Sequence, residues 1–224
     1  MPKFIRENSL GLFFGAIFLL ALVCQALAGW VAFNDEQVAE NLGRISLPDY
    51  LTSASFAADV AENWQSEYLQ FLLYIVATVW LVQLGSPESK ELHKAGQESE
   101  KDQKMGRYAT ATSPAWARAG GLRTALYSWS LGIVMGLIFL TSWFAQSLAG
   151  WAAFNETRLQ RLQDPISWGA YLVNADFWSR SLQNWQSEFL AVGSMAVLSI
   201  YLRQRGSPES KPVGAAHTST GIEG

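Results

Sequence analysis

Four long apolar runs, separated by polar segments, dominate the pattern of this 224-residue chain. The first lies at about residues 10–33 and the third at about residues 127–154, and each exceeds the roughly 20 apolar residues that cross a bilayer. The second and fourth, at about residues 64–84 and 185–203, are shorter, and each carries a glutamate near its start. The pattern predicts an all-α membrane protein with four transmembrane helices.

The two shorter runs are expected to belong to longer helices. Ser55 and Asp176 are residue types that favour helix N-caps, so these helices should begin near residues 56 and 177, ahead of the apolar run. The first run, with its basic start and the small residues Ala26 and Ala28, also resembles a signal peptide. Since a similar run recurs inside the chain, we interpret it as an uncleaved anchor.

Residues 9–90 recur as residues 130–211. The two stretches align without a gap at an interval of 121 positions, with 36 identities in 82. The best-kept motifs are Asn-Trp-Gln-Ser-Glu, at 63–67 and 184–188, and Gly-Ser-Pro-Glu-Ser-Lys, at 85–90 and 206–211. The sequence therefore predicts two tandem two-helix repeats in parallel orientation, related by an axis along the membrane normal.

The repeat divides the chain into four segments. The first repeat spans residues 1–90 and the second residues 122–211. Residues 91–121 between them and residues 212–224 after them are polar and lack apolar periodicity, which predicts a flexible cytoplasmic linker and a disordered tail. Within each repeat, the long loop between the two runs carries scattered apolar residues and should form a short outer interfacial helix.

The positive charges predict the orientation. Twelve of the sixteen Lys and Arg residues lie in the N-terminal segment, the segment 85–123 and the C-terminal segment after residue 202. Because such residues favour the cytoplasmic side, both termini should be cytoplasmic. Four tryptophans should then form an interfacial belt at the outer boundary of the spans: Trp30, Trp64, Trp151 and Trp185.

Composition limits the chemistry. Only 16% of the residues are charged and the net charge is −3, so no nucleic-acid partner is indicated. The single cysteine, Cys24, excludes an internal disulfide, and the sequence contains no metal-ligand spacing, phosphate loop or catalytic set. We therefore expect no catalytic residue, metal or cofactor. The expected partners are the lipid bilayer and either another membrane protein or a further copy of the chain.

Several polar side chains fall within the predicted spans. Glu67 and Glu188 lie three residues past a belt tryptophan, and an ionisable group at such a place suggests a function. Gln25 and Gln146 should lie at a comparable depth, so Gln25–Glu67 and Gln146–Glu188 hydrogen bonds are expected. The full predicted network comprises Gln25, Glu67, Gln146, Glu188, Gln65, Gln186, Asn63 and Asn184. It either ties the helices together or forms a proton, cation or substrate site.

Two further features recur in both repeats. Glycines at helical spacing along the first and third runs should let helix backbones approach closely. These predicted packing residues are Gly11, Gly15, Gly29, Gly132, Gly136 and Gly150. The Gly-Ser-Pro-Glu-Ser-Lys element fits a helix stop, while its identity at all six positions also fits a docking or ion-contacting turn.

The two repeated motifs carry a resemblance. Asn-Trp-Gln-Ser-Glu before a span, with Gly-Ser-Pro-Glu-Ser-Lys after it, resembles a bacterial integral membrane protein family catalogued only as a domain of unknown function. The resemblance covers both repeats and implies a bacterial inner-membrane location. It transfers no functional residue.

These observations favour a polytopic inner-membrane protein with a structural or interaction role and no enzymatic activity. One alternative is a small proton- or cation-coupled transporter or channel that uses Glu67 and Glu188. Another is an outward-facing envelope enzyme, which only the same two carboxylates would support.

Overall fold

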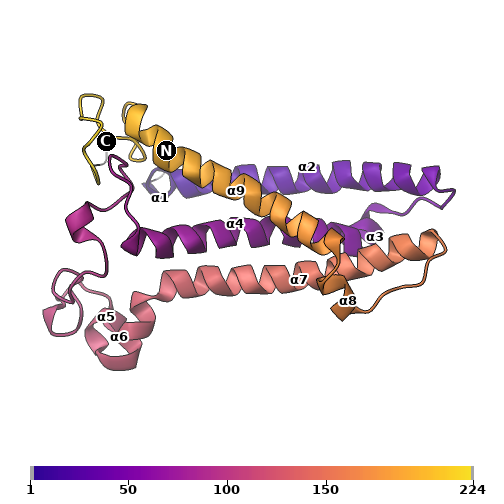
Figure 1. Ribbon diagram of the computed structural model, residues 1–224, viewed down its shortest axis with the longest axis horizontal. Helices are drawn as coiled ribbons and strands as arrows, with labels where there is room; N and C mark the ends of the chain where they lie inside the picture. Colours follow the sequence, from indigo (N-terminus) through magenta and orange to yellow (C-terminus); the bar gives the residue numbers. More distant parts are fainter. Residues whose placement is uncertain (1–2, 223–224) are drawn as a thin grey trace. The chain divides into compact units, whose positions relative to one another are not determined.

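The computed structural model describes residues 3–222, and every regular element within them is helical (Figure 1). The four long helices are α2 (Ser9–Ala39), α4 (Ala54–Trp80), α7 (Ser130–Gln160) and α9 (Ala175–Tyr201). The short ones are α1 (Lys3–Glu7), α3 (Leu47–Leu51), η1 (Leu92–Lys94), η2 (Gly106–Tyr108), α5 (Ala115–Ala119), α6 (Gly121–Ser128) and α8 (Trp168–Leu172). The predicted all-α class is confirmed.

The helix bounds follow the interval of the sequence repeat. Helices α7, α8 and α9 each begin and end 121 residues after α2, α3 and α4, respectively. The short helices α3 and α8 lie in the loops where short helices were expected. Ser53 and Asn174 occupy equivalent places before α4 and α9, where their side chains accept hydrogen bonds from the amides of Phe56 and Asp176. The predicted caps, Ser55 and Asp176, lie inside the helices instead.

The prediction of four spans is only partly confirmed. Among residues 3–222, two helices are long and apolar enough to cross a membrane, α2 and α7. Helices α4 and α9 do not meet this criterion because polar and charged residues, among them Glu62 and Arg180, occupy their first turns. None of the apolar stretch of α2 is buried, and only 22% of that of α7 is, so neither resembles the buried core helix of a soluble domain.

The chain forms two compact units. The first contains residues 3–61 and Ala145–Phe177, that is, α2, α3 and α8 with the adjoining ends of α4, α7 and α9. Its core contains two equivalent tyrosines. Tyr50 is 3% exposed and lies between Phe33 and Phe56, and Tyr171 is 1% exposed and contacts the equivalent aromatic rings. Burial, and then the nearby Asp59 charge, raises the pKa of Tyr50, which keeps its phenol neutral.

The second unit contains Glu62–Phe144 and the chain from Trp178 onward. It holds most of α4 and α9, the first half of α7, the linker and the tail. The linker, predicted to be flexible, contains η1, η2 and α5. The tail, predicted to be disordered, folds back on the turn after α4: the Gly85 amide donates to the Thr220 hydroxyl at 2.9 Å and the Gly221 amide to the Ser86 carbonyl at 3.0 Å.

Candidate functional site

A polar contact joins α4 to α9 at the repeated Asn-Trp-Gln-Ser-Glu motif. The side chain of Gln65 is fully buried, and its Oε1 accepts a 2.7 Å hydrogen bond from Trp185 Nε1. The equivalent glutamine of the second repeat, Gln186, is exposed. The two motifs are identical in sequence and still differ in environment, because each helix turns a different face toward its neighbour.

A charged contact lies next to it. Glu62 accepts hydrogen bonds from Asn184 Nδ2 at 2.6 Å and from Arg180 at 3.0 Å. The carboxylate therefore holds two residues that lie one helical turn apart on α9. Asn184 was predicted to belong to the polar network, whereas Glu62 and Arg180 were not. The difference in charge between the two loops could have indicated this contact. The first loop is rich in acidic residues, and the second carries arginines that can pair with them.

Aromatic side chains surround these contacts. The indole of Trp143 in α7 lies 5.6 Å from that of Trp185 and 6.1 Å from that of Trp178, measured between ring centroids. Its Nε1 donates to the buried hydroxyl of Ser181 at 3.4 Å. Such rings bury a large apolar area and leave one polar group to be satisfied, so this cluster fixes α7 against α9.

The predicted glutamine–glutamate pairs stay predictions. The Gln146 side chain is 2% exposed and has no hydrogen-bond partner among the described residues. Gln25 and Gln146 belong to the first unit, whereas Glu67 and Glu188 belong to the second, where they occupy equivalent places on α4 and α9. The side chain of Glu67 is exposed and that of Glu188 is half-buried.

The belt tryptophans have specific partners. Trp30 Nε1 donates to the Ile45 carbonyl at 2.9 Å, and Trp151 Nε1 donates to the equivalent Ile166 carbonyl at 2.7 Å. The same two loop residues are held by asparagines that were not predicted. Asn34 and Asn155 each donate to the isoleucine carbonyl and accept from its amide, at 2.7–3.1 Å. Each outer loop is therefore tied to the helix that precedes it.

The six predicted packing glycines fall into three pairs. A Cβ at Gly29 or Gly150 would overlap the buried phenol of Tyr50 or Tyr171, so a close approach is required there. Gly132 and Gly136 face the side chains of α4, at 3.7–3.9 Å from the Cβ position. A Cβ at Gly11 or Gly15 would meet no atom within 4 Å, so no close packing exists at these two glycines. The equivalent glycines of these last two pairs thus have different surroundings, because those of α7 lie against side chains of α4 and those of α2 do not lie against any atom within 4 Å.

The Gly-Ser-Pro-Glu-Ser-Lys elements form equivalent turns after α4 and α9. The second serine of each element, Ser89 or Ser210, accepts from the backbone amide of the glutamine at 83 or 204, at 2.8 and 2.9 Å. The initial glycines, Gly85 and Gly206, have φ angles of +88° and +81°, a conformation that favours glycine. The helices themselves end earlier, at Trp80 and Tyr201, so Gly85 and Gly206 are not the C′ residues that the helix-stop interpretation expected.

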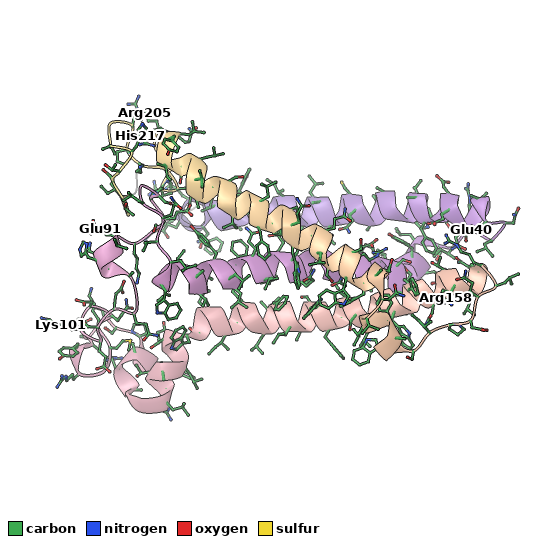
Figure 2. The ribbon with its side chains drawn as sticks, in the orientation of Figure 1. Glu40, Glu91, Lys101, Arg158, Arg205 and His217 are labelled. Atoms are coloured by element: carbon green, nitrogen blue, oxygen red, sulfur yellow. The ribbon has the colours of Figure 1, made fainter. Side chains whose placement is uncertain are left out.

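The two lysines of these elements differ in their surroundings. Lys211 is 1% exposed, and its Nζ donates to four carbonyls, those of Gly85, Ala216, His217 and Ser219, at 2.6–3.2 Å. Burial, together with repulsion from Arg203, lowers the pKa of Lys211. Lys90 instead pairs with Glu98 at 3.1 Å. Lys211 therefore joins the two turns and the tail. His217, which is labelled in Figure 2, shows where the tail lies.

The site contains no metal centre: among residues 3–222, no group of three His, Cys, Asp or Glu side chains is placed to bind one. The fold and the site define a helical protein. Two of its helices are apolar enough to span a membrane, and polar side chains join α4 to α9. The chain belongs to the family described as domain of unknown function (DUF6766), whose model matches residues 1–222. It matches no curated protein and no solved structure.

Proposed function

We propose that this chain is a multi-pass membrane protein of the bacterial inner membrane with a structural or interaction role. Its polar residues hold the helices together rather than carry out chemistry. The observation that carries this proposal is the buried Gln65–Trp185 hydrogen bond, flanked by the Glu62 contacts to Arg180 and Asn184. In that arrangement three residues of the two motifs, Gln65, Asn184 and Trp185, are engaged in contacts between helices.

The membrane location is supported by the surface of α2. Large apolar side chains are exposed on all sides of this helix, for example Leu10 at 72% and Leu20 at 65%. A contiguous surface of this kind needs lipid or protein to cover it. The positive charges of both termini and of the linker favour their placement in the cytoplasm. The equal interval of all three helix pairs supports two tandem repeats inserted in parallel.

Gln65 and Gln186 provide a matched test of the structural role. Gln65→Leu should lower the free energy of unfolding by about 1–3 kcal/mol, because the buried indole N–H of Trp185 loses its acceptor. Gln186→Leu, at the equivalent exposed position, should change the free energy of unfolding by no more than about 0.5 kcal/mol from that of the wild type. Thermal unfolding of both variants in the same detergent measures the difference. Equal effects would show that the buried contact does not hold the helices.

A transport role is the second candidate, and the half-buried Glu188 with its equivalent Glu67 favours it. Ionisable groups within transmembrane segments commonly mark proton or ion pathways. If the structural proposal is right, Glu67→Gln and Glu188→Gln should fold normally, and purified protein in liposomes should show the same proton and cation flux as the wild type. A flux that either substitution abolishes would replace the structural role with transport.

A further inference from the structure

A cavity of about 920 Å³ lies in the second unit, between the last turns of α4, the linker and the start of α7. This volume is within the range of small-molecule sites in proteins. The helical walls are apolar and include Ile75, Val76 and Val79 of α4 and Leu131 of α7. Gly132 of α7 also lines the cavity, and its Cβ position is 3.9 Å from Val76, an ordinary van der Waals distance, so α4 and α7 approach each other here. This part of the cavity suits a flexible hydrocarbon chain.

The linker closes the other side of the cavity as an ordered wall. Residues 110–114 form a turn in which the hydroxyl of Thr110 lies 3.1 Å from those of Thr112 and Ser113. Thr124 is buried in α6 and donates to the Trp116 carbonyl of α5 at 2.8 Å, which joins the two short helices. The hydroxyl of Thr124 is engaged in this bond, so the hydroxyls of the turn at residues 110–113 are those that can donate to the oxygens of an anionic group.

Two opposite charges lie on this wall. Lys104 and Glu100 both line the cavity, are exposed to solvent, and form no ion pair within the described residues. The other two charges of the lining, Lys90 and Glu98, form an ion pair with each other at 3.1 Å. A ligand that carries one positive and one negative group would complement the unpaired two.

We propose that this cavity binds an amphiphile with an apolar chain and a zwitterionic head that carries a phosphate and an ammonium, as in phosphatidylethanolamine-type lipids. The chain lies against α4 and α7. The phosphate accepts from Lys104 and the linker hydroxyls, and the ammonium pairs with Glu100. The inference rests on the proposed membrane location only in that the bilayer supplies the ligand.

The test is native mass spectrometry of the purified full-length protein in detergent, titrated with palmitoyl lysophosphatidylethanolamine. One molecule should bind saturably. Val76→Trp should weaken binding by about tenfold or more, because the indole occupies the space of the chain. Val197→Trp, the same change at the equivalent and half-exposed position of α9, should leave it unchanged. Ala125→Trp fills the cavity from α6 and provides a second variant if Val76→Trp does not fold.

The head group is tested by charge. Lys104→Gln and Glu100→Gln should each weaken binding by about tenfold, which is the value of one charge-assisted contact. Lys101→Gln changes a linker lysine that does not line the cavity and is labelled in Figure 2, so it should have no effect. Hexadecanol and phosphoethanolamine, which carry only the chain or only the head, should bind more weakly than the whole amphiphile.

Three results would overturn the proposal. They are the absence of saturable binding by the wild type, equal binding by the cavity-filling variants, and equal affinity for hexadecanol or phosphoethanolamine. A separate measurement distinguishes this failure from that of the proposed function. If the wild type fractionates with membranes and the glutamate variants keep wild-type flux, the structural role stands even without lipid in the cavity.

Discussion

Replacing Gly85 with alanine is expected to release the C-terminal tail from the turn after α4. The φ angle of +88° is unfavourable for alanine, at about 1–2 kcal/mol. The added Cβ would also overlap the His217 carbonyl and lie 3.0 Å from Ile200, and overpacking of this kind costs about 1–3 kcal/mol more. Because the His217 carbonyl accepts from Lys211, the lysine contacts should be lost with the tail.

Gly206→Ala is the matched control. Its φ angle is +81°, but a Cβ there meets no atom within 4 Å. Gly206→Ala should therefore lower the free energy of unfolding only through the unfavourable φ angle, without any steric overlap. Hydrogen exchange of residues 212–222, with thermal unfolding, measures both effects. Faster exchange in Gly85→Ala and unchanged exchange in Gly206→Ala are expected. If the tail exchanges at the unfolded rate already in the wild type, the tail contacts are not stable in solution.

The second large effect is expected for Tyr171→Ala. Tyr171 is 1% exposed and contacts Phe154 and Phe177 at ring-centroid distances of 5.4 and 5.6 Å. Truncation of a buried aromatic side chain costs about 3–5 kcal/mol, so the loop that contains α8 should lose its fixed position. Tyr171→Phe keeps the ring and removes only the 3.1 Å hydrogen bond to Asp176, which should cost about 1 kcal/mol.

Denaturant unfolding in detergent compares the three proteins. Tyr50→Ala repeats the change in the first loop, where Tyr50 is 3% exposed and contacts equivalent aromatic rings. Its effect should match that of Tyr171→Ala. A Tyr171→Ala protein as stable as Tyr171→Phe would mean that the ring adds nothing to the core of the first unit.

Much of the local structure could be predicted from the sequence. The helices, the short loop helices and the turns at 85–90 and 206–211 follow from apolar run length, turn residues and the 121-residue interval, all of which act on neighbouring residues. Glycine at the first position of each turn is needed for the same backbone reason in both repeats. The helix class therefore depended little on which segments meet, whereas the predicted ends of the helices differ from the observed ones by several residues.

The candidate site could be predicted only in part, because equivalent residues meet different neighbours. Gln65 is buried against Trp185, whereas Gln186 is exposed. Gly136 faces Leu72, whereas Gly15 faces open space. Glu67 is exposed, whereas the equivalent Glu188 is half-buried. A side chain's partner depends on which helix faces pack together, and an internal repeat gives both copies the same faces.

The sequence by itself determined the helical class, the 121-residue interval between similar segments, two apolar helices long enough to span a membrane and the turns that follow α4 and α9. These follow from covalent geometry and from the apolar pattern along the chain. Only the tertiary structure decided that Lys211 is enclosed by four carbonyls while Lys90 pairs with Glu98, and that the linker encloses a cavity. These contacts join residues far apart in the chain, and burial removes the water that would otherwise solvate their polar groups.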